Sequence, residues 1–157
     1  MNASIGLKES SRAKILDLLA RDLADLSVLS QKTRNFHWNV AGPRFNDLHK
    51  FFEGQYGAIE GEIDETAERS RALGGRALGS LKEMLAHARL QEAAAGRSPA
   101  ADAMLSELLR DHEAFIRSLR ADVDACGSLG DQGTADFLTG MLEAHEKMAW
   151  MLRAFLS

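Results

Sequence analysis

Among the side chains of this 157-residue chain that can bind transition metals, five form an informative cluster: His37, His49, Glu53, Asp64 and Glu68. The last four lie in a segment with the apolar periodicity of one long helix. At about 100° per residue, and with His49 as zero, Glu53 falls near 40°, Asp64 near 60° and Glu68 near 100°. Imidazole and carboxylate groups on one stripe predict a site for iron, manganese or zinc.

One chain cannot gather these four helical residues around one metal. His49 and Glu68 are separated by 19 residues, which is about 28 Å along a helix that rises 1.5 Å per residue. Two copies packed antiparallel about a two-fold axis near Ala58 place Glu53 of one chain opposite Asp64 of the other. The spacing therefore predicts two equal metal sites at a dimer interface.

Three glycines in the same helix, Gly54, Gly57 and Gly61, form a strip without side chains beside the acidic stripe. Each costs roughly 1 kcal/mol relative to Ala inside a helix, so a packing or functional reason is expected. The competing interpretation is an ordinary solvated helix face. In that case the acidic residues have no common role; they are Glu53, Glu60, Glu62, Asp64, Glu65 and Glu68.

Apolar residues spaced by three and four predict four long helices. The expected ranges are 11–40, 44–73, a third helix from about 100 to 126 and a fourth from about 131 almost to the carboxyl end. Ser98 is expected to cap the third helix, with Pro99 at its first position. Gly42 and Pro43 break the chain between the first two helices, which brings His37 beside the start of the second.

The connections between these helices predict the topology. Two short turns and one long crossover, residues 74–99, describe an all-α four-helix bundle of the ferritin-like kind. Apolar residues between Leu81 and Leu90 predict one short extra helix in the crossover. A short extension, residues 1–10, precedes a single bundle domain over residues 11–157.

Composition limits the classes of function. The chain is 45% apolar and has a net charge of −4, without the basic excess of a dedicated phosphate-backbone binder. The single cysteine, Cys126, excludes an internal disulfide, and no signal peptide or membrane span is expected. We therefore expect a cytoplasmic protein.

The remaining motifs favour structural roles over catalytic or ligand-binding ones. The chain lacks HExxH and Glu-x-x-His spacings, and the glycine-rich segment 74–79 follows no predicted strand, which favours a helix stop over a phosphate loop. His112 and His145 lie on apolar stripes without acidic residues three positions earlier. We expect them to be hydrogen-bonded core histidines.

Several segments closely resemble the Dps family, the mini-ferritins that protect DNA in starved or oxidatively stressed bacteria. They are RNFHWNVAGPRF at 34–45, LH at 48–49, DETAER at 64–69, LGG at 73–75, GSLKE at 79–83 and TAD at 134–136. The resemblance extends from about residue 11 to residue 156. It implies a ferritin-like bundle assembled as a hollow dodecamer.

The resemblance implies a ferroxidase, an oxidoreductase that acts on iron with hydrogen peroxide as preferred acceptor and stores the ferric mineral. The two histidines and Glu53 of one chain, with Asp64 and Glu68 of its two-fold mate, would bind the iron. The resemblance does not exclude that other divalent metals compete with iron for this site. Glu53 departs from the Asp that many members carry, which affects the second metal position.

Three further assignments follow from the same resemblance. Trp38, next to His37, is expected either to support the centre as a packing group or radical trap, or to be a core aromatic residue. Asp131 and Asp136 match acidic positions that line cation pores, and Asp131 is also a candidate helix cap.

DNA binding is the weaker expectation, because the amino terminus offers only Lys8, Arg12 and Lys14 against Glu9. An assembly of net negative charge repels duplex DNA unless the short amino termini of its subunits act together or divalent cations bridge the protein and the DNA. A nucleoid-associated DNA-binding protein with little catalytic role is thus one alternative. A purely structural helical assembly is the other.

Overall fold

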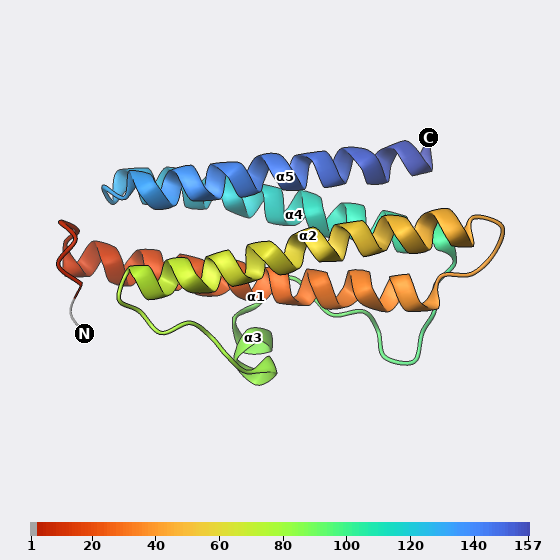
Figure 1. Ribbon diagram of the computed structural model, residues 1–157, viewed down its shortest axis with the longest axis horizontal. Coiled ribbons are helices and arrows are strands. Elements are labelled where there is room, and N and C mark those ends of the chain that lie inside the picture. The colour runs from red at the N-terminus through yellow and green to blue at the C-terminus, as the bar shows by residue number, and fades with distance from the viewer. Residues whose placement is uncertain (1–2) are drawn as a thin grey trace.

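The computed structural model describes residues 3–157, which form a bundle of four long helices (Figure 1). The helices are α1 (Glu9–Asn39), α2 (Phe45–Ala72), α3 (Leu81–His87), α4 (Ala101–Ser128) and α5 (Gln132–Leu156). α2 and α4 run opposite to α1 and α5 (Figure 1). No strand occurs in this part of the chain. The predicted all-α bundle with a short helix in its long crossover is confirmed.

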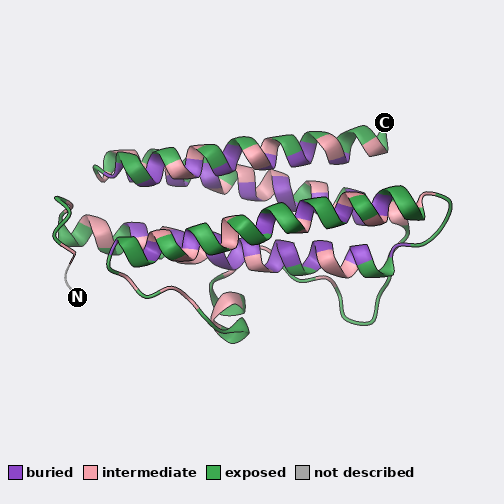
Figure 2. Ribbon diagram, in the orientation of Figure 1, coloured by how far each residue is buried: buried purple, intermediate pink, exposed green. Residues whose placement is uncertain are grey.

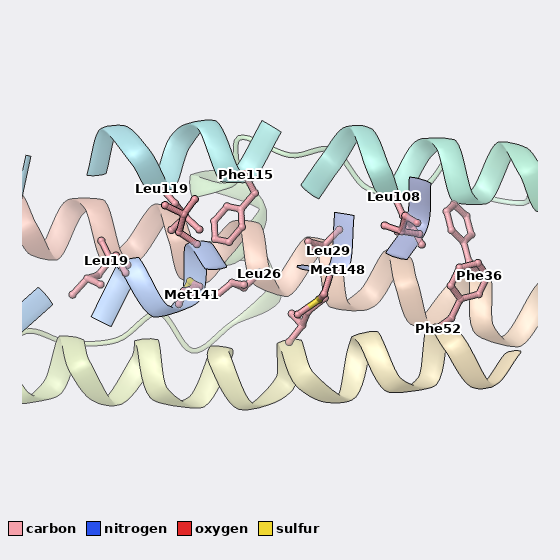
Figure 3. Packing of buried hydrophobic residues seen from close by; sticks show 14 of the residues in the cluster. Leu19, Leu26, Leu29, Phe36, Phe52, Leu108, Phe115, Leu119, Met141 and Met148 are labelled. Carbon is pink, nitrogen blue, oxygen red and sulfur yellow. The ribbon is translucent and has the colours of Figure 1, made fainter. Parts of the chain in front are cut away.

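The bundle consists of two helical hairpins. α1 packs along α2, and α4 packs along α5. The side chains of α2 and α5 contact one another along the length of both helices. Each long helix turns its buried face inward (Figure 2). Phe36, Phe52 and Leu108 meet towards one end of the core, and Leu19 and Met141 lie towards the other (Figure 3).

Local sequence explains most helix ends. Ser80 and Glu83 cap α3 reciprocally, because the Ser80 hydroxyl accepts from the Glu83 amide and the Glu83 carboxylate accepts from the Ser80 amide. Gly42 and Gly74 adopt φ of 105° and 81°, a region that favours glycine, where the chain leaves α1 and α2. α1 begins at Glu9, two residues before the predicted boundary.

The predicted start of α4 was wrong. The N-cap is Ala100, which provides no side-chain hydrogen bond, and the helix begins at Ala101. Proline disfavours helical angles in the residue before it, here Ser98. After the proline the chain is still extended at Ala100, with φ −61° and ψ 154°. Ser98 and Pro99 therefore belong to the crossover.

Arg89 fastens the crossover to the bundle. Its guanidinium donates to Asp22 Oδ1 at 2.5 Å, to Asp25 Oδ2 at 2.6 Å and to Asp122 Oδ2 at 3.1 Å. Asp25 also accepts from the backbone amides of Arg89 and Leu90. We call these four charged residues, one from the crossover, two from α1 and one from α4, the Arg89 clamp.

Candidate metal centre

His37 and His49 lie against each other where α1 ends and α2 begins. Their rings stack with centroids 3.8 Å apart and an interplanar angle of 19°. Nδ1 of His37 lies 2.7 Å from the carbonyl oxygen of His49, and Nδ1 of His49 lies 2.9 Å from the carbonyl oxygen of His37. The turn at residues 40–44 thus places the two histidines together, as predicted.

These reciprocal hydrogen bonds determine the tautomer of both rings. A carbonyl oxygen only accepts, so each Nδ1 must carry the hydrogen. In a neutral ring the Nε2 atom is then left with its lone pair, the form that binds metals. The backbone therefore holds two adjacent imidazoles in the ligand tautomer.

Aromatic and charged groups fix the orientation of this histidine pair. Phe45 stacks on His49 with ring centroids 5.1 Å apart, and the Tyr56 ring meets His37 edge-on at 5.3 Å. The Arg34 guanidinium covers the Tyr56 ring at 4.8 Å and donates to Glu60 at 3.0 Å. His37 is only 7% exposed, so its ring has little freedom to turn.

The three carboxylates of the predicted centre, Glu53, Asp64 and Glu68, project from the exposed face of α2. Within residues 3–157, no group of three or more His, Cys, Asp or Glu side chains converges as a metal site. That agrees with the helical spacing, which puts the carboxylates too far apart for one chain. A single copy provides the histidine pair and a separate acidic stripe.

The glycine strip lies on the same exposed face. A Cβ atom added at Gly54, Gly57 or Gly61 would meet nothing within 4 Å. Ala58, between them, is exposed as well. Packing within one chain therefore gives no reason for glycine at these positions.

Trp38 is 62% exposed, which excludes its interpretation as a core aromatic residue of this chain. Its neighbour His37 is buried, because successive residues lie about 100° apart around a helix and these two fall on either side of the boundary between the buried and the exposed face. A supporting role for Trp38 at the centre stays a prediction.

The two predicted pore residues differ in their surroundings. Asp131 is buried and caps α5: its carboxylate accepts from Thr134 N and Arg69 Nη2, both at 3.0 Å. Burial alone would raise the pKa of Asp131, but the hydrogen bonds from Thr134 and the Arg69 charge outweigh it, and the pKa is lowered. Asp136 is exposed, beside a hollow that Glu62 and Glu65 also line.

His112 and His145 are core histidines, as expected, but their acidic partner was not predicted. His112 Nδ1 lies 2.9 Å from His145 Nδ1, and His145 Nε2 lies 2.8 Å from Glu62 Oε2. Because a carboxylate oxygen only accepts, His145 carries a hydrogen on Nε2 and donates it to Glu62. Burial lowers the pKa of His112 well below its ordinary value, and its Nε2 has no partner.

The basic residues of the amino terminus remain near the surface. Lys8 and Lys14 are exposed, and Arg12 donates to the carbonyl oxygen of Ala3 at 2.7 Å. A role in DNA binding stays a prediction for all three. No helix within residues 3–157 has a stretch long and apolar enough to cross a lipid bilayer.

Comparisons with known proteins agree with this architecture. A family model for a ferritin-like domain matches residues 16–157. DNA protection during starvation protein 2 of Bacillus anthracis is 40% identical over 144 residues, which cover 92% of this chain and 97% of that protein. A low temperature-induced protein of a Nostoc species is 47% identical and covers 98% of this chain, with 86% of its own length matched.

A solved structure resembles the whole chain. The Dps protein of Vibrio cholerae O1, described as a member of a broad superfamily of ferritin-like diiron-carboxylate proteins, superposes with a TM-score of 0.94 at 30% identity. The superposition covers 100% of this chain and 98% of that one.

Proposed function

The chain belongs to the Dps family of ferritin-like proteins, and from this premise we propose that it oxidises ferrous iron at a centre shared by two copies. The observation that carries the proposal is the histidine pair. Both rings are held through Nδ1 by backbone carbonyls, which leaves both Nε2 lone pairs for a metal. A pair of histidines without this role has no need of such fixed tautomers.

The second copy supplies the missing carboxylates. Antiparallel packing of two α2 helices near Ala58 sets His49 and Glu53 of one chain against Glu68 and Asp64 of the other. Every site then combines imidazole and carboxylate ligands, a set that suits iron.

The glycine strip supports this packing. Residues without side chains let two helix backbones approach closely, and no contact within one chain uses them. Crowded carboxylates at such an interface would repel one another without a cation. Iron, as the substrate, would thus also stabilise the interface that binds it.

The residues have distinct parts in the reaction. The imidazoles and carboxylates hold ferrous ions close to hydrogen peroxide, which shortens the path for electron transfer. Each ferrous ion gives up one electron, and one peroxide molecule accepts two. The anionic ligands favour the ferric product because they compensate its higher charge.

Storage of the oxidised iron would depend on the assembly of the subunits. In a hollow dodecamer, the proposed form of this chain, ferric oxyhydroxide would collect in the cavity. Exposed Asp136 suits a ring of charge that draws cations inward. DNA would be protected because iron and peroxide, the two reactants that generate hydroxyl radicals, are removed together.

Direct DNA contact is a second candidate function, favoured by the exposure of Lys8 and Lys14 in a family named for DNA protection. Binding by these residues would weaken steeply as salt rises. Replacing Lys8, Arg12 and Lys14 together should then abolish gel retardation of duplex DNA, and retained binding would exclude this route.

The principal test is ferrous iron oxidation by the purified protein with stoichiometric peroxide, compared with oxygen. We expect fast oxidation in the natural protein and loss of the rapid phase in the His49→Ala, Asp64→Ala double variant with an unchanged assembly size. The matched control is His87→Ala, Asp124→Ala, which alters an exposed histidine and an exposed aspartate elsewhere. Equal rates in all three proteins would refute the proposal.

A further inference from the structure

The histidine pair is the middle of a longer column of stacked groups between α1 and α2. The ring centroids of Phe45 and His49 lie 5.1 Å apart, and those of His49 and His37 lie 3.8 Å apart. On the other side the Tyr56 ring meets His37 at 5.3 Å. The Arg34 guanidinium ends the column, 4.8 Å from the centre of the Tyr56 ring. We call these five residues the histidine column.

Helical spacing brings the members of the column face to face. On α1, Arg34 and His37 are three residues apart, and on α2, His49 and Tyr56 are seven apart, so each pair lies on one side of its helix. α1 and α2 pack side by side, and the two sides meet between them (Figure 1). Glu60, one turn after Tyr56, extends the same side of α2.

Tyr56 is the more firmly held end of the column. Its ring is half-buried, and a guanidinium within about 6 Å of a ring centre is attracted to it. Arg34 in turn donates to Glu60 at 3.0 Å, and the Ser30 hydroxyl donates to the same carboxylate oxygen at 2.6 Å. Phe45, at the other end, is 46% exposed. Tyr56 therefore constrains the histidines more than Phe45 does.

The hydrogen bonds at Nδ1 leave one motion of the imidazoles unconstrained. They fix the tautomer, but a ring held at one atom can still tilt about that contact, and a tilt turns Nε2 away from the metal. His49 packs on the His37 ring with an interplanar angle of 19°, whereas Tyr56 meets it at 78°. The two neighbours therefore restrict the tilt of His37 in different directions.

We propose that Tyr56 is a positioning residue of the iron centre, which sets the affinity of His37 for the metal, and that Arg34 holds Tyr56 in place. The effect of Tyr56 passes through the His37 imidazole, because that ring is what Tyr56 contacts. The inference rests on the proposed iron centre. Metal binding is measured without oxidation, however, so the two can fail separately.

The first experiment measures the affinity of the full-length protein for Co²⁺ without peroxide or oxygen, by calorimetry and by visible absorption. Groups that orient metal-binding histidines typically contribute about tenfold to a hundredfold to metal affinity, so Tyr56→Leu should bind Co²⁺ about tenfold more weakly. Tyr56→Phe keeps both ring contacts and should bind like the natural protein. Arg34→Gln, which uncovers the Tyr56 ring, should show an intermediate loss.

Two comparisons show whether the effect is specific to His37. Phe155→Leu is the matched control, since it removes a half-buried ring that packs on Phe51 at 4.7 Å, and its Co²⁺ affinity should not change. In a His37→Ala background, measured up to millimolar Co²⁺, Tyr56→Leu should weaken binding no further. A double-mutant cycle gives this coupling.

Thermal unfolding of the metal-free protein and assembly size are recorded for every variant. A merely structural role would lower stability but leave the Co²⁺ affinity of assembled Tyr56→Leu unchanged, and that result would overturn the proposal. An equal loss in Tyr56→Phe, or an undiminished effect in the His37→Ala background, would overturn it too.

Two further outcomes are distinguishable. If Tyr56→Leu does not assemble, Arg34→Gln provides the test, and natural Co²⁺ affinity in that variant would refute the role of the column. If the natural protein does not oxidise iron but Co²⁺ affinity falls as expected, the proposed function is wrong, whereas the positioning role of Tyr56 is supported.

Discussion

Removing the arginine of the Arg89 clamp should destabilise the protein strongly and in a pH-dependent way. Arg89 is the shared partner of three carboxylates that are almost fully buried, Asp22, Asp25 and Asp122. Breaking a buried ion pair by removing one partner costs about 3–5 kcal/mol, because the other charge remains buried without compensation. We expect Arg89→Ala to lose an amount in this range at pH 8.

The pH dependence follows from Asp22. Burial, and next the charge of Asp122, raises the pKa of Asp22 to about 7, although Arg89 opposes the shift. A raised carboxyl pKa contributes stability that is present below the ordinary pKa and is lost as the pH rises through about 7. The contribution changes by up to about 1.4 kcal/mol per pH unit in this window. Asp22→Asn should remove that slope.

Arg89→Ala should also lower the free energy of unfolding less at pH 5 than at pH 8, because the carboxylates that lose Arg89 can take up protons. In the double variant Asp22→Asn, Arg89→Ala, one buried charge is absent, so the penalty of Arg89→Ala should be partly relieved. A double-mutant cycle measures this coupling.

The assay is denaturant unfolding at pH 5 and pH 8, at one fixed protein concentration because assembly contributes to apparent stability. Arg76→Ala serves as the control, since Arg76 pairs with Glu83 on the exposed side of α3 and should change little. An Arg89→Ala variant as stable as Arg76→Ala, or a penalty independent of pH, would refute the reasoning.

Three further predictions concern single helices and their contacts. Gly57→Met should leave helix content intact but block pairing of the subunits, which sizing chromatography detects; normal assembly would disprove close α2 packing at the glycine strip. His145→Leu should destabilise by roughly 2–5 kcal/mol in thermal unfolding, because it leaves both Glu62 and His112 without their hydrogen-bond partner. His112→Leu, which removes the unpartnered Nε2, should cost less; the reverse order would contradict this account of the hydrogen bonds. Asp131→Ala should lower the free energy of unfolding by about 1–2 kcal/mol, because α5 loses its N-cap. In the natural protein this contribution should disappear as the pH falls through the lowered pKa of Asp131. A variant whose stability depends on acid pH as that of the natural protein does would contradict this role of Asp131.

The sequence was sufficient to predict the helices because their apolar residues repeat so regularly. Only local details differed: α1 starts at Glu9, and α4 starts at Ala101 instead of Pro99. Proline is permitted at a first helical position but does not determine one, so a neighbouring extended residue can shift the boundary.

The candidate centre was predictable in part. A short turn between two helices is enough to bring His37 near His49, but the crossed Nδ1 hydrogen bonds depend on ring orientations that spacing does not specify. Glu62 and His145 are 83 residues apart in the chain and meet across the bundle. Pairings of that kind follow from the way the two hairpins dock, which no local pattern records.

The most direct test of the shared iron centre mixes two inactive proteins. His37→Ala, His49→Ala lacks the histidine half of the centre, and Asp64→Ala, Glu68→Ala lacks the partner's acidic half. In a hybrid dimer, one of the two centres receives both defects and the other receives none.

Co-expression with different tags allows hybrid assemblies to be purified before peroxide-driven iron oxidation is measured. Random pairing makes half of the dimers hybrid, each with one intact centre of two, so about a quarter of the natural rate should return. Each variant expressed alone with both tags should stay inactive. Hybrid assemblies that form but remain as inactive as their parents would contradict a centre shared between two copies.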